Sequence, residues 1–249
     1  MKKYIKEKNS LLEISTVGVL LGAVVACSLT CSIILGGKYW DTLLYIAFLC
    51  MYYLNEFIAT AQYQTSELNS KLFMIYANRG NKEFLYVQCV TLFEALLRRG
   101  LLKYKFGSAR HLLQHNTARA WILTGITLIG GGIFIRRTAM KECGDSFNHI
   151  IQTSKGNQRF VSTGIYAYFR HPSYLGFYLF AIGIQIFLRN WINLLLTVTI
   201  LSLFFKKRIE FEEWFLINRI FGEKYVKYSA QVGHWIPFVV LKTSHRQES

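Results

Sequence analysis

The chain alternates between long apolar runs with little or no charge and short basic segments. Four such runs precede residue 137, at 14–37, 42–64, 84–97 and 120–135. The first, second and fourth are long enough to cross a bilayer as helices, whereas the third is short and contains Glu94. If every run spans, the basic segment after the third run lies on the lumenal side, against the positive-inside rule. Two other arrangements are therefore open: an interfacial helix at 101–114, or a re-entrant third run.

Two further uncharged runs, 175–188 and 191–205, are joined only by Arg189 and Asn190. Two runs of about bilayer length with so short a link predict a helical hairpin in lipid. A hairpin brings its ends back to the same side, so the polar groups that flank it should meet. These groups are Arg170, His171, Tyr174, Arg208, Glu212 and Glu213. Ionisable groups gathered at a membrane boundary predict a functional site.

The runs together predict an all-α, polytopic integral membrane protein with about six transmembrane helices, a C-terminal helical hairpin and both ends in the cytosol. We expect two regions. An N-terminal transmembrane bundle of about four spans covers 1–137, and a C-terminal region at 138–249 includes the membrane hairpin 172–206. A soluble connector is expected at 138–164, and the pattern at 209–228 is helical.

Composition and charge agree with a membrane protein, since 52% of the residues are hydrophobic and the mean hydropathy is +0.25. The net charge of +15 comes largely from basic residues that flank apolar runs. This placement fits cytosolic loops beside anionic lipid, so no nucleic-acid partner is expected. The five cysteines have no histidine or carboxylate at ligand spacing, so no metal site is expected. No Gly-x-Gly-x-x-Gly motif follows a strand-like run, which excludes a soluble Rossmann enzyme.

Two carboxylates, Glu56 and Glu94, lie inside apolar runs. Each could serve a function in the membrane. The alternative, which we favour, is that each lies near a helix end or faces another helix.

Several motifs occur in a specific order along the C-terminal half. They are Phe147-Asn148-His149-Ile-Ile-Gln152, then Tyr166-x-x-x-Arg170-His171-Pro172-x-Tyr174-x-Gly176, then the hairpin and Arg208-Ile-x-x-Glu212-Glu213, and finally Phe221-Gly-x-x-Tyr225-x-x-Tyr228 and Trp235-Ile-Pro237. In this order and spacing they resemble the isoprenylcysteine carboxyl methyltransferases. The resemblance covers 139–238 well and the N-terminal spans in outline.

The resemblance implies an enzyme that uses S-adenosylmethionine to methylate the C-terminal carboxylate of a prenylated cysteine. Its partners would be small GTPases and other CaaX-processed proteins, together with the lipid bilayer. It would be a multi-pass protein of the endoplasmic reticulum membrane with the cofactor pocket and active site facing the cytosol. The chemistry is compatible, because a carboxylate is already a nucleophile and a sulfonium is already an activated electrophile. Alignment and a cation for the carboxylate are needed, but no metal.

The resemblance also assigns residues. Arg208 would bind the substrate carboxylate and act in catalysis, although it could also be a snorkelling arginine at the membrane boundary. The residues expected to bind the cofactor are Gln152, Gln158, Arg159, Phe160, Val161, Tyr166, His171, Pro172, Ser173, Tyr174 and Glu212. Glu212 is expected at the ammonium group of the cofactor. Adjacent helical residues point about 100° apart, so Glu213 should not serve the same ligand, and its role is left open.

Other roles remain open. Arg170 could bind the cofactor carboxylate or a lipid phosphate, and Asn148 and His149 could contact the cofactor or only shape the connector. His171 could also cap a helix that starts at Pro172.

A substrate lipid must enter sideways from the bilayer, and we expect an opening between the span at 120–135 and the hairpin. Aromatic substitution at Gly131 or Gly132 should then impair substrate binding more than cofactor binding.

Three competing functions are kept. A related membrane methyltransferase could act on phospholipid amines or small thiols. A membrane sterol reductase has a similar C-terminal outline but usually more spans. A non-enzymatic lipid-binding or scaffolding protein could retain the pocket, and it would bind S-adenosylmethionine without methylating any acceptor.

Overall fold

The computed structural model describes residues 11–35, 39–63, 70–75, 82–105, 116–147 and 158–240. Every regular element in these ranges is helical. The elements are α1 (Leu11–Leu35), α2 (Trp40–Tyr63), η2 (Ser70–Phe73), α3 (Lys82–Lys105), α5 (Asn116–Cys143), η4 (Gly144–Ser146), η5 (Gly164–Ala167), α6 (Pro172–Leu188), α7 (Trp191–Phe215), the π-helix η6 (Leu216–Phe221) and α8 (Glu223–Gln231).

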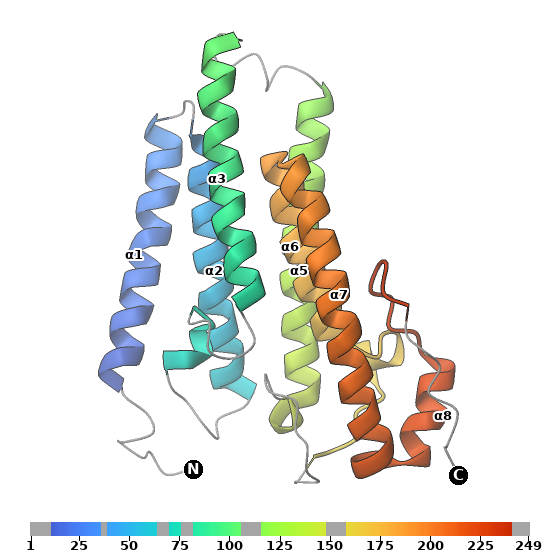
Figure 1. Cartoon of the computed structure of the whole chain (residues 1–249). Coiled ribbons are helices and arrows are strands. Elements are labelled where there is room, and N and C mark those ends of the chain that lie inside the picture. Colours follow the sequence, from blue (N-terminus) through green and yellow to red (C-terminus); the bar gives the residue numbers. More distant parts are fainter. Residues whose placement is uncertain are drawn as a thin grey trace.

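The long helices α1, α2, α3, α5, α6 and α7 run side by side as a bundle, and the short helix α8 lies at one end of it (Figure 1). Three of the helices, α1, α2 and α5, are long and apolar enough to cross a membrane. The structure therefore has a membrane-protein fold made of helices. The predicted spans in α3, α6 and α7 are helical as well, but six crossings remain a prediction.

Helix α5 is longer than its apolar run, because it continues past Arg136 and Arg137 to Cys143. In the sequence, these two arginines directly follow the apolar run 120–135 and were expected to mark the charged end of a span. Instead, Arg136 forms a buried ion pair with Glu56, and Arg137 donates a hydrogen bond to the Asn55 side chain at 3.0 Å. The expected connector at 138–164 was therefore wrong at its start, since the helix occupies its first residues.

The helical segment expected at 209–228 is also interrupted. Gly222 has a φ of +58° and a ψ of −137°, a conformation that favours glycine, and it separates η6 from α8. The turn lets α8 fold back beside the end of α7 instead of extending it.

Helices α5 and α6 make the most extensive helix contact in the described chain. A Cβ atom built on Gly132 would lie 2.5 Å from the Gly176 carbonyl oxygen and 2.7 Å from the Phe180 nitrogen. The two backbones touch because neither glycine has a side chain. The expectation of an opening between α5 and the hairpin is therefore wrong at Gly132. A Cβ atom built on Gly131 would meet nothing within 4 Å, so Gly131 does not take part in this contact. The predicted division into 1–137 and 138–249 stays a prediction, and the α5–α6 contact spans it.

The two acidic residues inside apolar runs have structural partners, as favoured above. Glu56 on α2 faces Arg136 on α5, where both are buried. Glu94 on α3 accepts hydrogen bonds from the backbone nitrogens of Ile192 (3.3 Å) and Asn193 (2.7 Å). Glu94 thus satisfies donors in the first turn of α7.

Candidate active site

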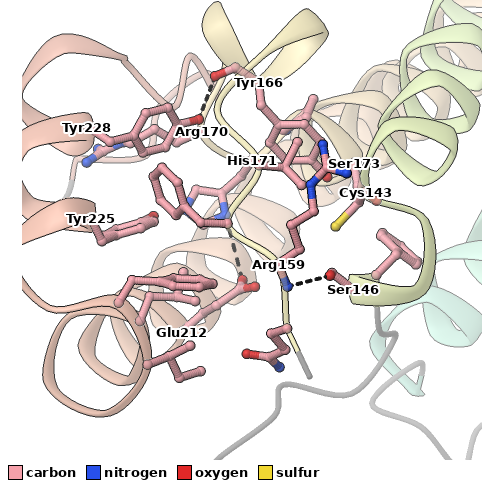
Figure 2. A pocket seen from close by; sticks show the side chains of 18 of the residues that line it. Cys143, Ser146, Arg159, Tyr166, Arg170, His171, Ser173, Glu212, Tyr225 and Tyr228 are labelled. Atoms are coloured by element: carbon pink, nitrogen blue, oxygen red, sulfur yellow. Dashed lines mark hydrogen bonds and ion pairs between the residues drawn. The ribbon is translucent and has the colours of Figure 1, made fainter. Parts of the chain in front are cut away.

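A cavity lies at the end of the bundle where the chain leaves α5 and later enters α6 (Figure 2). Its walls come from the end of α5, the segment 158–174, the end of α7 with η6, and α8. It encloses about 140 Å³. One buried water needs only roughly 10–15 Å³, so the cavity has room for part of a larger ligand.

All the predicted cofactor-binding residues in the described part of the chain line this cavity. They are Gln158, Arg159, Phe160, Val161, Tyr166, His171, Pro172, Ser173, Tyr174 and Glu212. Gln152, Asn148 and His149 lie outside the described residues. The fold thus brings two distant motifs together, as the hairpin predicted, while contact with a cofactor stays a prediction.

Other lining residues were not assigned from the sequence. They are Cys143, Ser146, Phe147, Leu216, Ile220, Phe221, Tyr225 and Tyr228, and Arg170, whose role was open, lines the cavity too. Tyr225 and Tyr228 are three residues apart on α8 and therefore share a face, a signal that could have been used. Leu216 and Ile220 belong to the π-helix, whose departure from the usual helical period leaves no such signal.

His171 occupies the N-cap position of α6, directly before Pro172. Its backbone oxygen accepts hydrogen bonds from the nitrogens of Tyr174 and Leu175, each at 3.1 Å. Its side chain does not cap the helix. The imidazole Nε2 instead lies 2.9 Å from Glu213 Oε1. The expected helix-cap position is confirmed, and the ring serves to join α6 to α7.

Three side chains lie around the carboxylate of Glu213. Besides His171, the Tyr225 hydroxyl donates to Oε1 at 3.3 Å, and Arg170 Nη1 lies 3.4 Å away. Burial raises the pKa of Glu213, but the hydrogen bond and charge of His171 and the charge of Arg170 more than offset this, so the net pKa is below its ordinary value. Glu213 therefore stays ionised and holds α6, α7 and α8 together beside the cavity.

Glu212 points into the cavity instead (Figure 2). Its Oε2 atom is buried and has no hydrogen-bond partner in the described residues, and it lies 3.6 Å from His171 Nδ1. A buried carboxylate oxygen without a hydrogen bond is costly unless a ligand supplies one. The two adjacent glutamates thus diverge as expected, and Glu212 can bind a positively charged group.

An aromatic wall closes the α8 side of the cavity. The Phe160 ring packs edge-on against Phe221 and Tyr228, with ring centroids 5.0 Å and 5.5 Å apart, and Lys224 Nζ lies 4.7 Å from its centre. The segment before this ring is held by a hydrogen bond from the Arg159 nitrogen to Ser146 Oγ at 2.8 Å. Aromatic faces beside fixed backbone groups suit a flat, partly polar ligand such as a nucleoside.

Tyr228 also ties α8 to the motif before α6. Its hydroxyl donates to the Tyr166 carbonyl oxygen at 2.6 Å. Burial raises the pKa of Tyr228 to about 12, so this hydroxyl stays protonated and remains a donor near neutral pH.

Arg208 lies next to the cavity but does not line it. Its Nε donates to the Tyr174 hydroxyl at 2.9 Å, and its guanidinium carbon is 5.4 Å from the Tyr174 ring centre and 6.0 Å from that of Phe204. Arg208 and Glu212 are four residues apart and share a helix face. Tyr174 therefore stands between the predicted substrate-binding cation and the cavity.

The comparisons with known proteins identify the family of the chain. A model of the isoprenylcysteine carboxyl methyltransferase family matches residues 123–218. The chain is 32% identical over 197 residues to the protein-S-isoprenylcysteine O-methyltransferase of Saccharomyces cerevisiae, covering 79% of each, and 34% identical over 199 residues to that of Schizosaccharomyces pombe, covering 78% of this chain and 83% of the relative. The chain belongs to the isoprenylcysteine carboxyl methyltransferase family.

A solved structure also matches, that of a eukaryotic intramembrane Ras methyltransferase described as an isoprenylcysteine carboxyl methyltransferase. The TM-score is 0.80 at 28% identity, over 92% of this chain and 78% of the other. Similarity over nearly the whole chain extends the family relationship to the N-terminal helices, which the sequence motifs matched only in outline.

In this isoprenylcysteine carboxyl methyltransferase family member, a buried ion pair supports the cavity from the bundle side. Arg136 Nε and Nη2 lie 2.5 Å and 2.6 Å from the two carboxylate oxygens of Glu56. Arg136 Nη1 donates to Ser173 at both Oγ (2.8 Å) and the carbonyl oxygen (3.1 Å). Because Ser173 lines the cavity, a pair between α2 and α5 positions one wall of the site.

Proposed function

We propose that this enzyme transfers the methyl group of S-adenosylmethionine to the C-terminal carboxylate of a prenylated cysteine, forming a methyl ester. The observation that carries the proposal is that the 170–174 and 208–213 motifs meet in a chain of this family, with Glu212 lining the cavity and Arg208 bonded to Tyr174 beside it. Its substrates would be CaaX-processed proteins, including small GTPases.

The cavity residues fit the cofactor. Glu212 Oε2, the buried oxygen without a hydrogen bond, would accept one from the cofactor ammonium group. Phe160 and the aromatic residues around it would pack against the nucleoside, whose polar edges would face the backbone at 158–161. When bound, S-adenosylmethionine would supply an electrophilic methyl group, and the acceptor carboxylate, which is already ionised, needs no base.

Arg208 would hold the acceptor carboxylate. A guanidinium has five N–H donors in a fixed fork that matches a carboxylate. The hydrogen bond from Arg208 Nε to the Tyr174 hydroxyl orients this fork beside the cavity wall. Arg208 and Glu212 would thus bind the two reactants on either side of Tyr174, which favours in-line alignment.

The membrane arrangement follows from the same proposal. The chain would cross the endoplasmic reticulum membrane about six times, with the cavity open to the cytosol. The cavity end of α7 carries Lys206, Lys207 and Arg208, and cytosolic loops are enriched in such residues. The prenyl chain would stay in the bilayer while the carboxylate reaches Arg208.

The test is methyl transfer in membranes that contain the full-length protein. Labelled S-adenosylmethionine is supplied with N-acetyl-S-farnesylcysteine, phosphatidylethanolamine or a small thiol. The proposal predicts a base-labile methyl ester on the farnesylcysteine alone. Label in the amine or the thiol would instead support the related membrane methyltransferases. Binding of S-adenosylmethionine without label in any acceptor would support a non-enzymatic role.

A further inference from the structure

The segment after α8, residues 232–240, rises alongside α7 toward the hairpin turn, away from the end where α8 lies (Figure 1). Three of its large apolar side chains are mostly exposed: Trp235 (68%), Phe238 (79%) and Val240 (77%). The segment contains no lysine, arginine, aspartate or glutamate. Large apolar side chains gathered on a surface indicate a contact with something apolar.

The depth of the segment is given by its contact with α7. Ser202 Oγ donates to the Pro237 carbonyl oxygen at 3.4 Å. Ser202 lies in the uncharged run of α7, four residues before its first basic residue, Lys206. At 1.5 Å per residue, Pro237 is level with a point about 6 Å along α7 from Lys206, inside the uncharged run. Leu203, the next residue along α7, is 58% exposed, so α7 also presents an apolar side chain at this level.

The backbone of the segment holds these side chains outward. Ile236 and Val239 are buried in the same apolar cluster as Phe205 of α7. Trp235 and Phe238 have φ values of +55° and +60°, the left-handed region that residues other than glycine seldom adopt. Such a conformation costs energy, and here it allows the buried pair to anchor the segment while both aromatic rings face out.

We propose that residues 232–240 enter the bilayer and place Trp235, Phe238 and Val240 among the acyl chains of the leaflet on the cavity side. A soluble partner could not readily reach a patch at the level of the uncharged run of α7. Aromatic residues at such a depth anchor proteins at the membrane boundary.

The inserted segment anchors two walls of the cavity to the membrane. The Gly233 carbonyl oxygen accepts a hydrogen bond from the Arg170 nitrogen at 3.0 Å, directly before His171. At the other end, the segment continues from α8, which carries Tyr225 and Tyr228. Insertion would therefore fix the height of the cavity relative to the bilayer surface.

Spin-label depth measurements test the proposal on the full chain in phosphatidylcholine vesicles. In a background with all five cysteines replaced by alanine, a nitroxide is attached at Phe238→Cys. Leu203→Cys on α7 is the lipid-level control, and Lys227→Cys on the exposed face of α8 is the water-level control. Collisions with oxygen, which enters lipid, are compared with collisions with a water-soluble nickel chelate. Val240→Cys provides a second reading if a label at Phe238 disturbs the segment.

The expected oxygen-to-nickel ratio at Phe238 is close to that at Leu203 and several-fold above that at Lys227. A ratio equal to that at Lys227 would place the segment in water and overturn the proposal. Protection from both reagents would show that a second copy or another protein covers the patch, which would also overturn it. The readout does not depend on methyl transfer, so it stands apart from the proposed enzymatic function.

Discussion

Glu212 and Glu213 are neighbours in sequence and both lie beside the His171 imidazole, but the fold orients their carboxylates differently. Glu212 presents a buried oxygen to the cavity, whereas Glu213 binds His171, Arg170 and Tyr225. The divergence follows from the 100° step between helical residues. Substitution of the first should affect ligand binding, and substitution of the second should affect stability.

Glu212→Gln is expected to weaken S-adenosylmethionine binding. The change removes one negative charge from a hydrogen bond to an ammonium group, and such charged hydrogen bonds contribute about 1.5–3 kcal/mol. The dissociation constant, measured by calorimetric titration in detergent, should rise roughly 10- to 100-fold. Glu223→Gln on the exposed start of α8 is the matched control and should bind like the wild type. An unchanged constant for Glu212→Gln would exclude the ammonium role.

The ionised Glu213 should stabilise the protein in a pH-dependent way. Its folded pKa is below the ordinary value of 4.5, so the stabilisation is fully present above that pH and is lost as the pH falls through the lower folded value. The thermal midpoints of wild type and Glu213→Gln should therefore differ at pH 7 and converge under acid conditions. A gap that widens on acidification would contradict the assignment.

At the residue scale, the motifs predicted most of the residues that line the cavity, because these residues lie in short segments that occur in a fixed order along the chain. Ser146 and Ile220 could not be predicted in this way. Ser146 reaches the Arg159 backbone only because η4 follows α5, and Ile220 depends on the π-helix. Such local departures from the α-helical period are set by packing and leave no periodic signal.

At the scale of elements, the Glu56–Arg136 pair is the main feature that the sequence concealed. Paired arginines after an apolar run are typical of a membrane boundary. The partner of Arg136 is 80 residues away on α2, so nothing local indicates the pair. Once α2 packs against α5, the pair joins both helices to Ser173 at the start of α6.

Glu56→Gln should strongly destabilise the bundle. Removing one partner of a buried ion pair leaves an uncompensated charge, at a cost of about 3–5 kcal/mol. Detergent-solubilised protein should unfold at a lower temperature. Glu56→Leu combined with Arg136→Met should recover much of that stability, because well-packed apolar residues can replace a buried pair.

The double variant also separates stability from positioning. It still lacks the hydrogen bonds from Arg136 to Ser173, so its S-adenosylmethionine dissociation constant should remain raised. If restored stability also restored cofactor affinity, Arg136 would support the fold without positioning the cavity wall.

At the scale of the whole molecule, six crossings would place the basic residues at the hairpin-turn end on the lumenal side, against the positive-inside rule. Two of them have structural partners. Arg98 Nη2 donates to the Leu188 carbonyl oxygen near the end of α6, and Arg189 lies 3.5 Å from Asp41. Basic side chains commonly satisfy the last carbonyls of a helix. Two of the positive charges at this end therefore have a local structural role, and they need not report on which side of the membrane this end lies.

Six crossings make a specific prediction about topology. Figure 1 shows the start of α1, the end of α7 and α8 at the same end of the bundle, and the hairpin turn at the other. An N-glycosylation acceptor inserted between α1 and α2 should be glycosylated in endoplasmic reticulum membranes, whereas acceptors added at either terminus should not. Glycosylation at one terminus alone would require an odd number of crossings.

The hairpin shows why distant parts of the site could be predicted from the sequence. Its two runs and short link require Arg170 and Arg208 to lie on the same side, whatever the N-terminal helices do. The close α5–α6 contact could not be predicted, because the glycines alone do not show which helix each one faces. The prediction of a substrate opening at Gly132 was wrong for that reason.

The central claim is that Arg208 and Glu212 bind different reactants on either side of Tyr174. The most direct test is Arg208→Lys, which keeps the positive charge but loses the bidentate fork. Steady-state methylation of farnesylcysteine and binding of S-adenosylmethionine should be measured on the same preparation, with Lys207→Ala as the control. We predict that kcat/KM for the acceptor falls by at least about tenfold, since one charged hydrogen bond is lost, while the cofactor dissociation constant stays within about twofold. An equal loss of cofactor binding, or no loss of acceptor turnover, would contradict the account.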